Sequence, residues 1–319
     1  MFALYSIVAV FLVLVIAAVG FIYLAPERFT HWAIKQARQR AGLIRKEIDL
    51  PDGLHYVYLE GGKGEPLMLL HGFGGSKDNF AMVARYLTPH FQVIIPDEFG
   101  FGESSRPLDG DYTPPAQAEH LHALTQALGL SRVHVGGNSM GGQIALTYAA
   151  RYPTEVTSLW LLDSAGVWSA PKSEMMKIVE EGGRNPLLIK SENDFAQVIK
   201  FLMSKPPFTP RPMLNVLARA RLQNLELEQR ILKQFSGDSV EKRIAGLSTP
   251  TMIVWGEKDR VFNVATAEVL HKLMPKSQVV ILPDTGHVPM MERPEESAEA
   301  YLRFRKSLGL PPMIESSQS

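Results

Sequence analysis

A single serine lies among glycines in residues 135–146, VGGNSMGGQIAL. One interpretation of Ser139 is an N-cap residue, because serine often begins a helix in this way. The other is a nucleophile on a tight strand-to-helix turn with the pattern G-x-S-x-G. In that case Gly137 and Gly141 permit the turn, and Gly142 lets the helix approach the strand closely. The pentapeptide alone does not decide between the two, so the partners of the serine have to be sought elsewhere in the chain.

A serine hydroxyl needs a neighbouring base, and the base needs a carboxylate that orients it. In enzymes that carry a serine on such a turn, the partners follow in the order serine, acid, histidine. Of the nine histidines, only His271 and His287 come after Ser139. His271 belongs to a helical pattern, whereas His287 lies in a loop directly after the apolar run Val279–Leu282. The sequence therefore predicts His287 as the base.

Two aspartates at the ends of predicted strands compete for the role of the acid. Asp259 lies in WGEKD, just past the apolar run Thr251–Trp255, and Asp163 ends the run Leu161-Leu162-Asp163. We expect Asp259 to orient the histidine. Asp163 remains the rival until a substitution separates the two.

An acyl-transfer site also needs hydrogen-bond donors for the oxyanion. The residue after the nucleophile supplies one backbone N–H, here that of Met140, and a loop after an early strand supplies the other. Leu70-His71-Gly72-Phe73-Gly74-Gly75 is such a loop. We expect the N–H of Phe73 to be the second donor.

The segments around these residues alternate between strand-like and helix-like hydrophobic patterns. Short apolar runs such as Pro66–Leu70 fit strands that are buried on both faces of a sheet. Alternation at this spacing favours βαβ units and a mostly parallel sheet. The expected strands are 45–50, 54–60, 66–70, 91–96, 132–135, 156–162, 251–255 and 278–282, and the expected helices are 79–87, 115–128, 141–152, 265–274 and 295–308.

A long helical segment interrupts this alternation after Asp163. It is rich in Met, Leu and Lys and shows no strand pattern, which predicts a helical cap inserted into the α/β domain. Apolar cap side chains line ligand sites in such insertions. The candidates for a substrate pocket are Trp168, Met175, Leu188, Met203 and Val288.

The N-terminal segment has the composition of a membrane anchor. Residues 1–26 contain no charged side chain. A helix over Phe2–Leu24 spans about 35 Å, which exceeds a hydrocarbon core of roughly 30 Å. Basic residues follow this segment and none precedes it, so the positive-inside rule places the remaining domain on the cytoplasmic side. We expect Phe29–Arg40 to form a short basic helix near the lipid headgroups.

These observations divide the chain into six segments. They are a transmembrane anchor (1–26), a basic interfacial linker (27–43), the first part of the α/β core (44–164), the cap (165–245), the second part of the core (246–310) and a flexible tail (311–319). Composition excludes several classes of function for the whole. Lys plus Arg and Asp plus Glu both number 33, so no net field attracts nucleic acid. The absence of cysteine excludes disulfides and thiolate chemistry.

The motifs together resemble the α/β-hydrolase superfamily over most of residues 50–308. The match comprises His71–Gly75, Gly137–Gly142, the loop Asp97–Ser104, Trp255–Asp259 and the segment Thr285–Pro294. The resemblance implies a mostly parallel sheet flanked by helices, a structural role for Asp97, and hydrolysis without a cofactor or metal. The basic stretch, the anchor and S-M-G-G-Q are similar to membrane-anchored monoacylglycerol lipases, which implies lipid-like ester substrates. The oligomeric state remains open.

One residue of the serine motif departs from that branch. Asn138 gives G-N-S-M-G-G, which is similar to hydrolases that cleave carbon–carbon bonds of aromatic ring-fission products. Those enzymes usually carry a proline in the glycine loop, which Phe73-Gly74-Gly75 lacks, and their substrates are soluble. A ligand-binding protein without enzymatic activity is a further alternative, because a fold does not determine a function. Dehalogenases and epoxide hydrolases of this fold use an aspartate nucleophile, and position 139 is serine.

Overall fold

A single twisted sheet forms the centre of the molecule in the computed structural model, which describes residues 2–309. Its strand order is β1-β2-β4-β3-β5-β6-β7-β8. β2 runs antiparallel to both β1 and β4, and all other neighbours are parallel, which confirms the expected mostly parallel sheet. The strands are β1 (Ile44–Asp49), β2 (His55–Gly61), β3 (Pro66–Leu70), β4 (Gln92–Pro96), β5 (Val133–Asn138), β6 (Val156–Leu162), β7 (Thr251–Gly256) and β8 (Ser277–Leu282).

Both faces of this sheet are buried, as the apolar strand β3 illustrates. Met68 and Leu70 belong to one hydrophobic cluster, while Leu67 and Leu69 belong to another on the opposite face. Side chains alternate between the faces of a strand, so a wholly apolar run is what a doubly covered strand requires. The helices that cover the sheet are α3 (Ala81–Ala84), α4 (Pro114–Ala127), α5 (Met140–Arg151), α11 (Thr266–Leu273), α12 (Pro289–Glu292) and α13 (Pro294–Ser307).

One expected helix is much shorter than the sequence pattern predicts. In place of a helix over residues 79–87, the chain forms the 3₁₀ turn η1 (Lys77–Phe80) followed by the four residues of α3. Ser76 and Asn79 close a capping box around the turn. After α3 the chain makes only tight turns up to His90, and Pro89 cannot donate the backbone hydrogen bond that a continuing helix needs.

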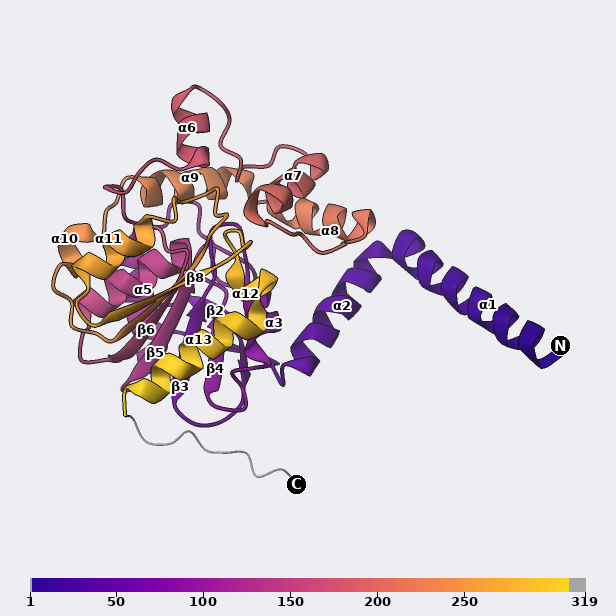
Figure 1. Cartoon of the computed structure of the whole chain (residues 1–319), viewed down its shortest axis with the longest axis horizontal. Helices are drawn as coiled ribbons and strands as arrows, with labels where there is room; N and C mark the ends of the chain where they lie inside the picture. The colour runs from indigo at the N-terminus through magenta and orange to yellow at the C-terminus, as the bar shows by residue number, and fades with distance from the viewer. Residues whose placement is uncertain (1, 310–319) are drawn as a thin grey trace.

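The expected cap lies between β6 and β7. Residues 164–250, all of which the structure describes, contain helices and turns but no strand. Figure 1 shows these helices along one edge of the domain, above the ends of the strands. They are α6 (Glu174–Glu180), α7 (Glu192–Leu202), α8 (Arg211–Leu222), α9 (Leu225–Ser236) and α10 (Glu241–Ile244).

Two helices precede the sheet and extend from the domain (Figure 1). The first, α1 (Phe2–Leu24), is long and apolar enough to cross a membrane, with a mean hydropathy of 3.1 over Tyr5–Leu24 and no part of that span buried. The second, α2 (Pro26–Arg40), begins three residues earlier than expected because Pro26 occupies its first turn, where a missing N–H costs nothing. The residues expected to form a tail, 311–319, lie outside the described part of the chain.

Two ion pairs attach α2 to the rest of the molecule. The Arg38 guanidinium donates two hydrogen bonds, of 2.7 and 2.8 Å, to the carboxylate of Asp78 in η1. At the other end of α2, Glu27 accepts a hydrogen bond of 2.7 Å from Arg219 of α8. These pairs link α2 both to the core and to the cap.

Candidate active site

Ser139 lies at the turn between β5 and α5. Its φ of 55° is in the left-handed region, which a residue other than glycine adopts only where the surroundings enforce it. A Cβ on Gly137 would stand 2.3 Å from the Gly141 oxygen, and one on Gly141 would stand 2.2 Å from the Leu70 oxygen. The hydroxyl makes no capping hydrogen bond to α5. The turn is therefore as tight as expected, and although Ser139 occupies the N-cap position of α5, its side chain does not cap the helix.

His287 and Asp259 meet at the carboxyl ends of the neighbouring strands β8 and β7. Nδ1 of His287 lies 2.9 Å from Oδ2 of Asp259, and the two side chains are 3% and 0% exposed. The other carboxylate oxygen accepts the backbone N–H groups of Val261 and Phe262 at 2.8 and 3.2 Å, which fixes the carboxylate in place. With Nδ1 turned to the acid, Nε2 remains as the nitrogen that can take a proton. Among the described residues, the Ser139 hydroxyl forms no hydrogen bond with His287 in this structure.

Asn138, the residue that set the serine motif apart, connects the turn to the histidine loop. Its Nδ2 donates hydrogen bonds of 3.0 Å to the backbone oxygens of both His287 and Leu162. The side chain is buried and ties β5, β6 and the loop after β8 together. Asn138 therefore holds the histidine loop beside the serine, and no separate substrate chemistry is needed to explain it.

The glycine loop after β3 presents an amide to the same site. His71 Nδ1 lies 2.8 Å from the Gly72 oxygen, which also accepts the N–H of Gly75 at 3.0 Å. Because N–H and C=O point in opposite directions across a trans peptide, the N–H of Phe73 is directed away from these partners. A Cβ on Gly72 would stand 3.2 Å from that of Ser139, so this peptide lies against the serine. Neither Phe73 N–H nor Met140 N–H donates to any other described residue.

His71 was not singled out as a site residue, although it fixes this peptide. Its Nε2 accepts the N–H of Glu98 at 3.0 Å while Nδ1 donates to Gly72, which requires the neutral ring. Burial lowers the pKa of His71 and so maintains that state. The only sequence signal was its position immediately before the glycines. Asp97 has the expected structural role, because its carboxylate accepts from the Lys77 ammonium at 2.6 Å and from two backbone amides.

Asp163 lies close to Asp259 but has a different environment. Its Oδ1 accepts the N–H of Gly256 at 3.0 Å, and its Oδ2 has no donor among the described residues. Complete burial, together with the charge of Asp259, raises the pKa of Asp163 well above its ordinary value. Ligand atoms of Asp163, Asp259 and His287 all lie within 4.8 Å of one another, a spacing that also suits a metal ion. His287 faces Asp259 rather than Asp163, so the geometry favours Asp259 as the orienting acid.

The five candidate pocket residues occupy different surroundings. Trp168 lies 6.0 Å from the ring of Phe262, which in turn packs edge-on against His287 at 5.5 Å. Met175 of α6 is partly buried and packs on the first core cluster, while Met203 and Val288 are buried in the second one. Leu188 lines a cavity of about 260 Å³ between α7 and its flanking loops.

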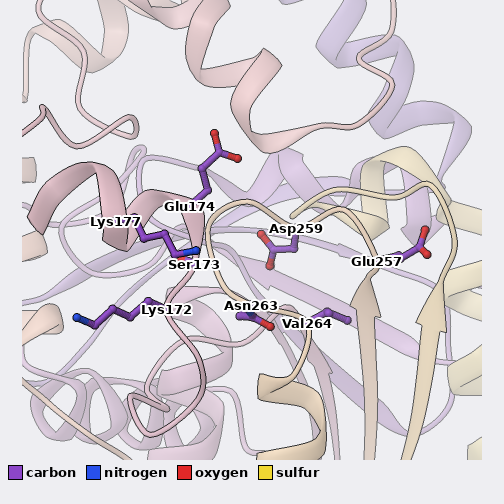
Figure 2. A pocket seen from close by; sticks show the side chains of 8 residues that line it. All are labelled: Lys172, Ser173, Glu174, Lys177, Glu257, Asp259, Asn263 and Val264. Atoms are coloured by element: carbon purple, nitrogen blue, oxygen red, sulfur yellow. The ribbon is translucent and has the colours of Figure 1, made fainter. Parts of the chain in front are cut away.

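A second cavity, of about 290 Å³, opens at the seam between cap and core. Figure 2 shows its lining, with cap residues around α6 facing the loop after β7 that carries Asp259. The lining residues are Lys172, Ser173, Glu174, Lys177, Glu257, Asp259, Asn263 and Val264. This cavity is polar, so it is unsuited to an acyl chain. Ser139 itself is 7% exposed.

Comparisons with known proteins agree with this geometry. A sequence profile of the alpha/beta hydrolase fold matches residues 65–294. Lipase 1 of Psychrobacter immobilis is 48% identical over 287 residues, which cover 88% of this chain and 89% of that protein. A monoacylglycerol lipase of Xenopus laevis is 30% identical over 274 residues, which cover 80% of this chain and 80% of that protein. The crystal structure of a membrane phospholipase A superimposes with a TM-score of 0.87 at 36% identity, covering 96% of this chain and 99% of that one.

Proposed function

The chain belongs to the α/β-hydrolase family, and from this premise we propose that it is a membrane-anchored serine hydrolase that cleaves carboxylic esters of lipid-like substrates such as monoacylglycerols. Its relatives include lipases and a monoacylglycerol lipase. The observation that carries the proposal is the arrangement at the ends of the central strands. Ser139 sits on a strained turn near two backbone amides that have no partner among the described residues, and the Asp259–His287 pair belongs to the same cluster of strand ends.

In the proposed reaction, the Ser139 oxygen attacks the ester carbonyl while Nε2 of His287 removes its proton. The N–H groups of Phe73 and Met140 receive the negative charge that develops on the carbonyl oxygen. One such donor lowers the barrier by about 3–4 kcal/mol in comparable sites. The tetrahedral intermediate collapses as the histidine returns the proton to the leaving alcohol. An acyl-enzyme on Ser139 remains.

Water then completes the cycle by the same route. His287 removes a proton from the water, the resulting hydroxide attacks the acyl carbonyl, and the proton passes back to Ser139. Asp259 holds the ring so that Nε2 faces the serine, and it stabilises the imidazolium that forms in each half-reaction. The backbone amides of Val261 and Phe262 keep its carboxylate in position throughout.

Substrate rates and active-site labelling test this proposal. We expect a fluorophosphonate probe to label the native protein and not the Ser139→Ala variant. Rates on p-nitrophenyl esters should rise with acyl-chain length, and monoacylglycerol should be hydrolysed. Failure to label Ser139 would indicate a ligand-binding role instead. Turnover of a ring-fission dienoate alone, without ester cleavage, would assign the chain to carbon–carbon hydrolysis.

The anchor and its orientation are part of the same proposal. α1 carries no charge and is long and apolar enough to cross a membrane, and the cations that follow it support a cytoplasmic position for the domain. Carbonate-washed membranes should retain the full chain. A Leu108→Cys variant provides a unique thiol for a membrane-impermeant maleimide, because the chain has no cysteine and Leu108 is exposed. Labelling in inverted vesicles only is the expected result, and labelling in intact cells would reverse the assigned orientation.

A further inference from the structure

The loop between α7 and α8 presents an aromatic side chain to the surroundings. It comprises residues 203–210, MSKPPFTP, which we term the proline loop. Phe208 at its tip is 94% exposed, the highest value among the described large hydrophobic side chains. Burial of an aromatic side chain is favourable because it removes apolar surface from water. Such a residue in a defined position indicates a partner for the loop.

The base of the proline loop is firmly attached, so the position of Phe208 is set by the fold. The N–H groups of Ser204 and Lys205 donate to the Glu292 carboxylate at 2.9 and 3.0 Å. The Lys205 ammonium pairs with Asp284 at 3.1 Å. Three prolines restrict the backbone torsions of the loop. These contacts and the prolines hold the Phe208 ring in its exposed position.

The same base contacts the candidate active site directly. The backbone oxygen of Leu202, the last residue of α7, accepts the N–H of His287 at 2.7 Å. Asp284 and Glu292, which hold the loop, belong to the segment that carries His287. A partner that contacts Phe208 is therefore connected to the proposed base, His287, through only a few residues of the chain.

The loop leads into the cap helix that lies nearest the anchor. α8 begins at Arg211, directly after the loop, and packs against both α1 and α2. Figure 1 shows α8 ending beside the junction of these two helices. The ion pair between Arg219 and Glu27 fixes this arrangement. The loop and the end of the anchor consequently lie on the same side of the molecule.

We propose that the proline loop is a second contact with the bilayer that α1 spans, and that Phe208 inserts at the level of the lipid headgroups. This inference rests on the proposed membrane anchor. Lys205 and Arg211 flank the ring, and cations beside an aromatic residue suit the boundary between acyl chains and anionic headgroups. The contact holds the histidine side of the active site against the lipid from which the substrate comes.

The absence of cysteine from the chain allows a direct test in the full-length protein. A Thr209→Cys variant, which keeps Phe208, carries a single environment-sensitive fluorophore and is reconstituted into vesicles of phosphatidylcholine and phosphatidylglycerol. Some vesicles contain a phosphatidylcholine with a nitroxide near the headgroup end of its acyl chain, for position 209, and others contain one with the nitroxide deep in the acyl chain, for position 13 at the middle of α1. Val13→Cys in α1 reports on the anchor. Val179→Cys, an exposed position on α6, reports on a part of the cap away from the loop.

We expect the lipid nitroxide to quench the fluorophores at positions 209 and 13 but not at 179. Quenching at 13 without quenching at 209 would overturn the loop contact and leave the anchor intact. Quenching at neither position would contradict the anchor and the loop contact together. A blue shift at 209 that grows with protein density, without quenching by lipid, would show that a second copy of the chain covers Phe208 and would also overturn the proposal.

A comparison of hydrolysis rates tests whether the loop contact favours substrates that are embedded in a membrane. For Phe208→Ser, we expect the rate of hydrolysis of a monoacylglycerol embedded in vesicles to fall about threefold or more. The reason is that the variant has no aromatic side chain to bury at the membrane interface. The rate on soluble p-nitrophenyl acetate should stay unchanged, since Phe208 does not touch the reacting atoms. Val179→Ser is the matched control and should alter neither rate. Equal losses on both substrates, or no loss on the embedded one, would contradict the proposal.

Discussion

At the scale of single residues, strain and burial are concentrated where the chemistry is proposed. Three residues other than glycine have a positive φ in the described chain, namely Ser139, Asp163 and Asp284. Each follows the end of a central strand and belongs to the serine turn, the acid cluster or the histidine loop. Asp163 and Asp259 lie together, yet only Asp259 receives backbone donors on one oxygen and the histidine on the other. Two adjacent buried carboxylates do not both ionise readily, and burial beside Asp259 raises the pKa of Asp163 well above its ordinary value.

Substitutions by asparagine separate these two aspartates. We expect Asp259→Asn to lower kcat by about 10⁴-fold, because the amide favours the wrong histidine tautomer. Asp163→Asn replaces a protonated carboxyl by a neutral group of the same shape and should retain activity within about tenfold. Measurement of kcat on a p-nitrophenyl ester with both folded variants distinguishes them. A larger loss for Asp163→Asn than for Asp259→Asn would exchange the roles.

Thermal denaturation across pH provides a control for the protonation of Asp163. The raised pKa in the folded state means that the proton contributes stability fully below the ordinary value of 3.8. This contribution is lost as pH rises through the folded-state value. The parent should therefore lose stability relative to Asp163→Asn as the pH increases. Parallel curves for the two proteins would show that Asp163 is ionised in the fold.

At the scale of elements, a buried ion pair within the cap places a guanidinium against the glycine loop that carries Phe73. Arg221 at the end of α8 donates to Glu228 of α9 at 3.0 and 2.6 Å and to the Leu187 oxygen at 3.1 Å. Its guanidinium also lies over the ring of Phe73, 5.7 Å from the centroid. Gly74 has no room for a Cβ because the same guanidinium fills that space. The position of the loop that supplies the second oxyanion donor thus depends on a cap residue.

Removing Arg221 tests this dependence. Arg221→Met leaves Glu228, which is 5% exposed, as a buried carboxylate without a partner, at a cost of about 3–5 kcal/mol. The double variant Arg221→Met/Glu228→Leu removes both charges and should recover most of that loss. Thermal unfolding measures the stability, and the ester rate reports on the loop. Equal stability of the single and double variants would mean that the pair does not support the cap.

At the scale of the whole molecule, several buried histidines are held neutral. Burial lowers the pKa of His71 beside the serine, of His120 on α4 and of His134 on β5, the last to about 4. His134 contacts Ser158 at 2.8 Å, and Ser158 in turn contacts Tyr301 of α13 at 3.0 Å. These rings lie in different parts of the core. Protonation of any of them opposes the packing of the sheet against its helices.

The fold should accordingly be sensitive to mild acid. A lowered pKa means that stability is complete above the ordinary histidine value of about 6.5 and is lost as pH falls toward the folded-state value. For His134 alone the loss is on the order of 3 kcal/mol between about pH 6.5 and 4. Urea unfolding at a series of pH values should show this decline, and His134→Gln should flatten it. An unchanged slope in the variant would exclude His134 as its source.

The kind of interaction determined which parts of the fold and of the candidate site could be predicted from the sequence. Apolar runs and glycine spacing predicted the sheet, the serine turn and the position of the cap, because each depends on local pattern. The helix expected over residues 79–87 was wrong in length, because the chain makes tight turns after Ala84 that the hydrophobic pattern does not reveal. Asn138 and Asp163 could not be assigned from the sequence. The first acts on a loop 149 residues further along the chain, and the second owes its protonation to burial.

The sheet ends on one side at β1, whose outer edge has no partner strand in the described chain. Open strand edges recruit other strands, and confinement to the plane of a bilayer would bring copies of an anchored chain together at high density. β1 reads IRKEID, and its Arg45 and Lys46 pair with Glu103 and Glu60. Fixed charges along that edge make stacking of neighbouring copies into a continuous sheet unfavourable. The charges on β1 therefore protect this edge against aggregation.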